Sequence, residues 1–303
     1  MTDYSRGAAY LDGAYMPIAE ARIPVTHMAY RRSDVTYDVV GVRDGNFFRI
    51  EDHIKRFRAS MTELRMTPKE TDDDLRRILH RIVALSGLRD AYVAMDCLRA
   101  SPPPGAPRHS AFAPCYLMCF AVPWVSLASP TQIENGFHLI IAGTQRISRK
   151  SVDPKVKNFH WGDLTRGQFE ALDQGADTCV LLDEDGFVTE GPGFNVFCIV
   201  DGKVISPRRG ALEGITRKSV FELCDTLGLP SEETDITAET LRGSDEIFTC
   251  TTAGGIMPVS RIDGRIMNND RPGPLTRKLY DSFWQRRAEG WHAIPVDYSA
   301  ATA

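Results

Sequence analysis

The chain has 303 residues, of which 43% are hydrophobic, 25% charged and 9% aromatic, a composition normal for a globular protein of about two domains. Its 36 Lys and Arg against 40 Asp and Glu give a formal net charge of −4, which argues against nucleic-acid binding because such proteins usually carry a basic surface. No run of 18 or more apolar residues predicts a membrane span, and residues 1–10 lack the basic-then-apolar pattern of a signal peptide.

The cysteines and histidines do not predict a metal site. There are seven cysteines, an odd number, with no Cys-x-x-Cys spacing, and most lie in apolar runs. The seven histidines include no His-Glu-x-x-His motif. These patterns predict reduced, buried thiols in a cytoplasmic protein that binds no metal.

Apolar periodicity predicts four helices. Between residues 50 and 64 the apolar positions are spaced 4, 3, 4 and 3, which places them on one helix face. A second helix is expected over 72–86, because three aspartates favour its positive end and Gly87 lies near its other end. Two further helices are expected over 216–227, before Gly228, and after Pro274.

Asp-Gly pairs at 44–45, 185–186, 201–202 and 263–264 indicate tight hairpin turns, and therefore antiparallel strands in both halves of the chain. Strands and helices come in runs rather than in strict alternation, which favours an α+β protein over a doubly wound sheet. A proline-containing break at 123–136 predicts a linker between a small N-terminal α/β domain, 1–122, and a large C-terminal domain, 137–303.

Five short motifs carry the candidate chemistry. Each has an ordinary interpretation when taken singly: a surface lysine, a strand-end carboxylate, a helix-capping threonine. There is no Gly-x-Ser-x-Gly motif, and Gly191-Pro-Gly193 lacks the third glycine of a dinucleotide-binding fingerprint. The motifs are Asp153-Pro-Lys-Val-Lys157-Asn158, Trp161-Gly-Asp163, Thr189-Glu190-Gly-Pro-Gly-Phe-Asn195, Leu212-Glu-Gly-Ile-Thr216 and Cys250-Thr-Thr-Ala-Gly-Gly255.

Together and in this order, the motifs resemble the fold-type IV family of pyridoxal-phosphate enzymes. That family includes branched-chain aminotransferases, D-amino-acid aminotransferases, aminodeoxychorismate lyases and (R)-selective amine transaminases. The resemblance covers nearly the whole chain, because Ser33-Asp-Val-Thr-Tyr-Asp, Asp44-Gly-Asn-Phe-Phe-Arg and His53-Ile-Lys-Arg56 also match. It implies two α/β domains with pyridoxal 5′-phosphate between them, and a homodimer.

The resemblance also implies roles for individual residues. Lys157 is expected to bind the cofactor aldehyde as a Schiff base, although spacing alone does not exclude Lys155. Glu190 is expected to lie against the pyridine nitrogen, and Asn195 to hold the same strand or to serve as a turn amide. The phosphate is expected to be bound by Arg56, Ile215, Thr216, Thr251 and Thr252, partly through a helix start.

The substrate pocket resembles two branches of the family. The run from Val152 to Asp163 is similar to (R)-selective amine transaminases, whereas Tyr30 and Pro107-Arg108-His109 are similar to D-amino-acid aminotransferases. Arg108 is expected to bind the substrate carboxylate, with Arg31, Arg32 and Arg43 as alternatives whose other interpretation is surface charge. The remaining pocket residues are expected to be Tyr30, Tyr37, Val39, Tyr92, Trp161, Thr252 and Ala253.

These features predict a transaminase that moves an amino group between (R)-amines or D-amino acids and a keto acid such as pyruvate, in two half reactions. Its partners are then small-molecule amines and keto acids. The alternatives are a branched-chain L-amino-acid aminotransferase or an aminodeoxychorismate lyase on the same fold. A binding protein without catalysis is disfavoured by the intact set of Lys157, Glu190, Arg56 and Thr216.

Overall fold

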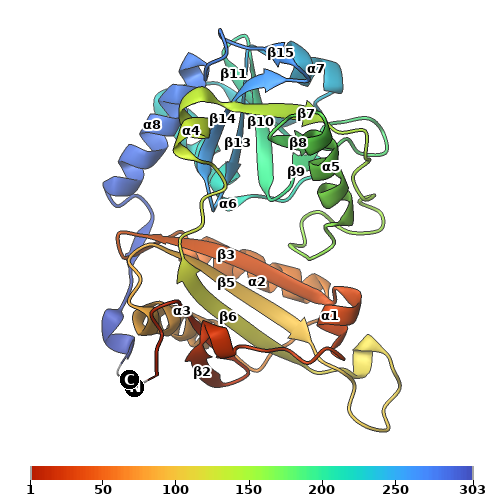
Figure 1. Cartoon of the computed structure of the whole chain (residues 1–303), viewed down its shortest axis with the longest axis vertical. Helices are drawn as coiled ribbons and strands as arrows, with labels where there is room; N and C mark the ends of the chain where they lie inside the picture. The colour runs from red at the N-terminus through yellow and green to blue at the C-terminus, as the bar shows by residue number, and fades with distance from the viewer. Residues whose placement is uncertain (1, 302–303) are drawn as a thin grey trace. The chain divides into compact units, whose positions relative to one another are not determined.

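A computed structural model describes residues 2–301, which form two compact units (Figure 1). Unit 1 comprises the described residues up to Val125, together with Val156–Phe159 and those from Trp291 onward. Unit 2 comprises Ser126–Lys155 and His160–Gly290. The predicted α+β class is confirmed. The predicted domain limits, 1–122 and 137–303 with a linker at 123–136, stay a prediction.

Unit 1 is built on a seven-stranded antiparallel sheet with the strand order β16-β4-β3-β5-β6-β1-β2. Its last strand in sequence, β16, lies at one edge, so the end of the chain completes a sheet that the beginning of the chain started. The strands are β1 (Ala8–Leu11), β2 (Ala14–Pro17), β3 (Val35–Arg43), β4 (Asn46–Phe48), β5 (Ala91–Arg99), β6 (Cys115–Pro123) and β16 (Ala293–Pro295).

Two helices, α2 (Ile50–Glu63) and α3 (Asp72–Ser86), cover one face of this sheet, and both confirm the helices predicted there. Their apolar sides meet alternate residues of the strands, so that Val40, Phe57, Leu79 and Val93 are fully buried in one core. A short helix α1 (Met28–Arg32) precedes β3, and the 3-10 turns are η1 (Ile18–Glu20), η2 (Ser110–Phe112) and η3 (Tyr298–Ala301). The loop that carries η2 extends beyond the ends of β5 and β6 (Figure 1).

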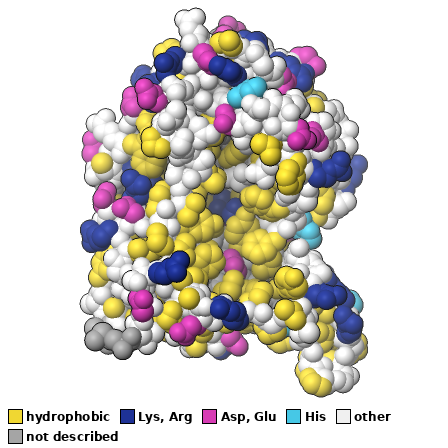
Figure 2. All heavy atoms as spheres, in the orientation of Figure 1, with side chains coloured by type: hydrophobic (Ala, Val, Ile, Leu, Met, Phe, Trp, Pro, Cys, Tyr) yellow, Lys and Arg dark blue, Asp and Glu magenta, His cyan; other side chains and the backbone are white. Residues whose placement is uncertain are grey.

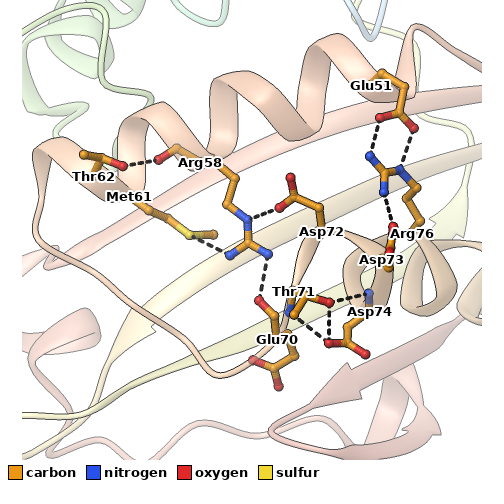
Figure 3. Close-up of polar contacts among 10 residues, drawn as sticks. All are labelled: Glu51, Arg58, Met61, Thr62, Glu70, Thr71, Asp72, Asp73, Asp74 and Arg76. Carbon is orange, nitrogen blue, oxygen red and sulfur yellow. Dashed lines mark hydrogen bonds and ion pairs between the residues drawn. The ribbon is translucent and has the colours of Figure 1, made fainter.

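Polar contacts join the two helices along their outer side (Figure 3). Arg58 on α2 donates to a carboxylate oxygen of Asp72 at 2.7 Å and to the carbonyl oxygen of Glu70 at 2.8 Å. Arg76 on α3 forms a two-pronged ion pair with Glu51. Thr71 caps α3 in a reciprocal capping box with Asp74. These bonds connect α2 with the start of α3.

Unit 2 is built on a mixed nine-stranded sheet with the order β12-β11-β10-β13-β14-β7-β8, to which β15 and β9 add at β14 and β10. Strands β11 and β12, β14 and β7, and β7 and β8 pair in parallel. The strands are β7 (Phe137–Ile141), β8 (Thr178–Val180), β9 (Glu190–Gly191), β10 (Phe194–Val200), β11 (Lys203–Pro207), β12 (Ser231–Thr234), β13 (Glu246–Thr251), β14 (Gly255–Ile262) and β15 (Arg265–Ile266).

Helices pack against this second sheet and bury its apolar residues. Among them α6 and α8 confirm the helices predicted at 216–227 and after Pro274, and Leu279 and Phe283 of α8 are fully buried. Helix α5 packs on β8 through Leu164 and Ala171. The helices are α4 (Pro130–Asn135), α5 (Gly162–Asp173), α6 (Ile215–Leu227), α7 (Ala238–Gly243) and α8 (Pro274–Ala288).

The four Asp-Gly pairs lie where the sequence predicts turns. Those at 44–45, 201–202 and 263–264 join β3 to β4, β10 to β11 and β14 to β15, with positive φ at both residues. The pair at 185–186 closes a single antiparallel bridge between Leu182 and Val188. A further pair, Asp12-Gly13, joins β1 to β2 in the same way.

The surface carries charges of both signs, which are interspersed over the face shown in Figure 2. None of the helices described between residues 2 and 301 is long and apolar enough to cross a membrane.

Candidate active site

Lys157 belongs to unit 1, although the chain on both sides of residues 156–159 belongs to unit 2. The segment lies along the edge of β3, where Thr36 forms an antiparallel bridge with Asn158. The Lys157 carbonyl oxygen accepts hydrogen bonds from Thr36 Oγ1 at 2.7 Å and from the Tyr37 amide at 3.1 Å. Its own amide donates to Ser60 Oγ at 3.2 Å. Three hydrogen bonds therefore fix the backbone of Lys157.

The amine of Lys157 lies over the ring of Tyr37, with 4.4 Å between Nζ and the ring centroid. Lys155, the competing lysine of the motif, differs in every respect. It lies in unit 2, its side chain is 67% exposed, and it forms an ion pair with Glu213 at 2.8 Å. The structure therefore distinguishes a half-buried, positioned lysine from a solvated one.

A buried carboxylate, Asp38 of β3, binds α2, the helix whose Ser60 accepts the hydrogen bond from the Lys157 amide. Its two oxygens accept hydrogen bonds from Arg56 Nε and from a terminal nitrogen of Arg56, both at 2.8 Å. His53 Nδ1 lies 2.8 Å from Asp38 Oδ1. Burial opposes the charge of Asp38, but Arg56 and His53 outweigh it and hold the pKa of Asp38 well below its usual range. Burial lowers the pKa of His53, so this imidazole is neutral and donates.

The face of the sheet opposite α2 and α3 collects three residues of the predicted pocket. Side chains alternate along a strand, so Tyr37 and Val39 of β3 point away from the core that contains Val40. Tyr92 of β5 lies on the same face, opposite Gly41 in the register. Asp96 also lies on this face, directly opposite Tyr37 and only 4% exposed. Burial raises the pKa of Asp96 to about 7.

Unit 2 holds a second carboxylate in a buried ion pair. Glu190, 8% exposed on β9, accepts a hydrogen bond from Arg146 through Oε1 at 3.0 Å. Arg146 also donates to Asp163 at 2.6 Å. Burial opposes the charge on Arg146, yet Glu190 and Asp163 outweigh it and raise the Arg146 pKa. The permanent positive charge of Arg146 stabilises Glu190 as a carboxylate.

The backbone of Leu212 links this carboxylate to the start of α6. Glu190 Oε2 accepts from the Leu212 amide at 2.9 Å, and Asn195 Nδ2 donates to the Leu212 carbonyl oxygen at 2.8 Å. Glu190 and Asn195 are paired across β9 and β10, so both reach the backbone of the same residue. Two residues further on, Gly214 caps α6, and a Cβ there would lie 2.0 Å from the Asn195 side chain. Gly214 is therefore required by close packing.

The start of α6 suits an anion. No side chain caps it, and its first residues, Ile215 and Thr216, are buried. The amide groups of a first helical turn have no partner inside the helix and carry the positive end of the helix dipole, which together favour phosphate. Thr251 and Thr252 lie at the turn between β13 and β14, also in unit 2, and Ala253 accepts a hydrogen bond from the Leu127 amide at 3.2 Å.

The predicted site residues thus fall into two sets. Unit 1 carries the lysine, Arg56 and most of the predicted substrate-facing residues, and unit 2 carries Glu190, the helix start predicted to bind phosphate and the rest of the predicted pocket. Trp161, the first residue before α5, belongs to unit 2 and contacts the hairpin at Gly193. The members in unit 1 are Tyr30, Tyr37, Val39, Arg56, Tyr92, Arg108 and Lys157, and those in unit 2 are Trp161, Glu190, Asn195, Ile215, Thr216, Thr251, Thr252 and Ala253.

The candidate carboxylate-binding arginines fall into two groups. Arg31 and Arg32 are exposed on α1, and Arg108 is exposed on the loop before η2. Hydrogen bonds from Ser101 Oγ to the Thr26 carbonyl oxygen, at 3.0 Å, and from Ser110 Oγ to Met28 Sδ, at 3.4 Å, join this loop to the segment around α1. Arg43 lies at the other end of β3, where it pairs with Asp90 and stacks on Trp124.

The residues of the two sets fit pyridoxal 5′-phosphate. The cofactor needs an amine for its aldehyde, a carboxylate for its ring nitrogen and donors for its phosphate. A positioned lysine amine, an ionised buried carboxylate and an uncapped helix start are all present. When bound, the cofactor supplies an electron sink for negative charge on a substrate carbon. This set defines an enzyme of amino-group chemistry.

Comparison with known proteins identifies the family. The family model described as Amino-transferase class IV matches residues 36–262. The chain therefore belongs to the class IV aminotransferases, and it is a pyridoxal-phosphate-dependent enzyme. The branched-chain amino acid aminotransferase of Thermobaculum terrenum, solved in its PLP-form, is 26% identical with a TM-score of 0.86, and the match covers 97% of this chain and 100% of that one.

Relatives with different substrates in their names are similar to this chain. The "Putative branched-chain-amino-acid aminotransferase" of Methanocaldococcus jannaschii is 29% identical over 276 residues, 90% of this chain and 94% of the relative. The D-alanine aminotransferase of Bacillus licheniformis is 27% identical over 270 residues, 88% of this chain and 93% of the relative. Membership of the family therefore leaves the substrate undecided.

The raised pKa of Asp96 predicts a pH-dependent stability. Between the ordinary carboxyl pKa of 3.8 and about 7, the folded state binds a proton at Asp96 that the unfolded state does not bind. The free energy of unfolding therefore falls as pH rises through this interval. Asp96→Asn removes the titration and should stabilise the protein, relative to wild type, by roughly 1–3 kcal/mol more at pH 8 than at pH 5. Urea unfolding at both pH values measures this, and an equal difference at both contradicts it.

Proposed function

We propose that this class IV aminotransferase moves an amino group between D-amino acids or (R)-amines and a keto acid such as pyruvate. The observation that carries the proposal is the cluster at one end of unit 1. There α1, with Tyr30, Arg31 and Arg32, is tied by hydrogen bonds to the loop that carries Arg108. A guanidinium binds a carboxylate through two parallel hydrogen bonds, so these arginines suit the keto-acid partner.

Lys157 is the residue we propose to bind the cofactor. Its backbone is fixed by Thr36, Tyr37 and Ser60, so its side chain starts from a fixed point. With the cofactor and a substrate bound, Nζ of Lys157 would accept the proton of the substrate carbon and return it. The ring of Tyr37 holds this amine against the sheet.

Glu190 is proposed to bind the ring nitrogen of the cofactor and to keep it protonated, because Arg146 and the Leu212 amide stabilise its negative charge. The phosphate is proposed to bind the amides of Ile215 and Thr216, with Thr251 and Thr252. Arg56 is proposed to contribute charge. Two nitrogen atoms of its guanidinium already bind Asp38, so we propose that Arg56 attracts the phosphate by its charge rather than through two parallel hydrogen bonds.

The substrate is proposed to lie on the face of the unit 1 sheet that carries Tyr37, Val39 and Tyr92. Trp161, Thr252 and Ala253 of unit 2, and Tyr30 of unit 1, are also proposed to contact the substrate. We further propose a homodimer in the cytoplasm. The cytoplasmic location is supported by the cysteines, all seven of which are thiols rather than disulfides.

A second candidate is transamination of branched-chain L-amino acids. It is supported by the names of several relatives, including the similar archaeal protein and the solved structure from Thermobaculum terrenum. The two candidates differ in the configuration of the amine, which a substrate panel resolves directly. Aminodeoxychorismate lyase chemistry differs again, because it releases a product without an amino acceptor.

The first prediction separates the two lysines of the motif. Lys157→Ala should abolish transamination, because it removes the amine that binds the cofactor and moves the proton. Lys155→Ala should retain it, because this side chain is solvated and paired with Glu213. Borohydride reduction of the loaded enzyme followed by peptide mapping gives an independent measurement. A label on Lys155 would overturn the assignment.

The second prediction concerns Glu190→Gln. A neutral amide cannot stabilise a protonated ring nitrogen, so turnover should fall by orders of magnitude while the cofactor still binds. Asp163→Asn is the matched control, since it removes the other carboxylate on Arg146. Turnover and cofactor absorbance are measured for both variants. Near-normal turnover of Glu190→Gln would show that Glu190 does not face the ring nitrogen.

The third prediction tests the proposed function itself. With pyruvate or 2-oxoglutarate as acceptor, (R)-1-phenylethylamine and D-alanine should be donors, and the (S)-amine and L-alanine should not. Arg108→Ala should weaken the half reaction with the keto acid by about one to two powers of ten, the loss of a charge-assisted bond, and affect the aryl amine less. Preference for the L or (S) series would reject the proposal in favour of the second candidate.

A further inference from the structure

Asp96 is a buried carboxyl group with no protein partner. It lies in the middle of β5, it is 4% exposed, and no hydrogen bond or ion pair reaches its carboxylate from any residue between 2 and 301. In this it differs from Asp38 on the neighbouring strand, whose oxygens accept from Val39, His53 and Arg56. Buried charges in proteins are normally paired, so an exception calls for a function.

The position of Asp96 is on the face of the sheet that turns away from the helices. Met95 and Cys97, its neighbours in sequence, are buried in the core under α2 and α3, so Asp96 points the other way. In the register it lies directly between Tyr37 of β3 and Met118 of β6. Tyr92 lies on the same face of β5, four residues before Asp96 in the strand.

Lys157 lies at the border of the same site. Its amine is 4.4 Å from the centroid of the Tyr37 ring, and Tyr37 and Asp96 are cross-strand partners, whose Cβ atoms lie about 4.5–5.5 Å apart. A substrate whose amino group reacts near Lys157 Nζ and whose side chain runs over Tyr37 therefore brings its far end to Asp96.

We infer that Asp96 is a specificity-determining residue that binds an ammonium group at the end of the substrate side chain and repels a carboxylate there. The inference deepens the proposed function and rests on the part of it that places the substrate beside Lys157. An ammonium supplies both the charge and the hydrogen-bond donors that the protein itself does not offer to this carboxylate. Tyr37 and Tyr92 flank the alkyl part of such a side chain.

The test uses three amino acids of similar length that differ only in their terminal group: ornithine, with an ammonium, norvaline, with a methyl group, and glutamate, with a carboxylate. Single-turnover half reactions of the loaded enzyme are followed by cofactor absorbance at pH 8.5, with the D and L series run separately. Wild type should react in the order ornithine, norvaline, glutamate. Asp96→Asn should lower the ratio of ornithine to glutamate rate constants by about ten- to a hundredfold.

Asp12→Asn is the matched control, because it removes an exposed carboxylate of the same unit from the turn between β1 and β2. Its ratio should equal that of wild type. If Asp96→Asn does not fold, Asp96→Leu, uncharged and similar in volume, replaces it. A wild-type preference for glutamate, or an unchanged ratio in the Asp96 variants, overturns the inference. Reaction of the L series alone rejects the proposed configuration, while the ratio still reports on Asp96.

Discussion

Hydrogen bonds between two side chains and the backbone of one residue, Leu212, organise the candidate site of unit 2. Glu190 accepts from the amide of Leu212, and Asn195 donates to its carbonyl oxygen. Leu212 lies two residues before Gly214, which caps the first turn of α6. The carboxylate and the start of α6, which we propose to bind the phosphate, are consequently connected through one short stretch of chain. A cofactor with a ring nitrogen at one end and a phosphate at the other needs its binding groups at a fixed spacing.

In unit 1, ion pairs and hydrogen bonds to a buried carboxylate, Asp38, hold a helix against the sheet. Asp38 is ionised although it is buried, because Arg56 and His53 bind it. These bonds hold α2 against β3, and Ser60 of the same helix accepts a hydrogen bond from the Lys157 amide. Asp96 lies on the adjacent strand, opposite Tyr37 and on the other face of the sheet, and it has no such support. The same sheet therefore carries Asp38, whose hydrogen bonds to protein groups have a structural role, and Asp96, which we infer to bind a substrate group.

The sequence alone predicts the helices and turns well, because their signals are local: periodicity for α2, α3 and α6, and Asp-Gly pairs for the hairpins. The motifs around Lys157 and Glu190 also indicate the family. Arg146 could not be predicted as the partner of Glu190, since the two are 44 positions apart and only the sheet brings them together. Asp96 could not be singled out for a similar reason, because a single polar residue in an apolar run does not reveal which face of the strand it occupies.

The chain enters unit 1 three times, and this has a consequence for biosynthesis. The unit 1 sheet lacks its edge strand β16 until residues 293–295 are synthesised, and the lysine segment, residues 156–159, follows the first part of unit 2 in the chain. During synthesis, residues up to Val125 can form the core beneath α2 and α3 early. The free edge of β4 stays unpaired until Ala293–Pro295 is synthesised. All residues of unit 2 precede Trp291, whereas unit 1 also needs the residues from Trp291 onward. The sheet of the N-terminal unit is therefore the last to gain all of its strands. Removing β16 would thus expose the edge of β4, a strand formed by residues 46–48.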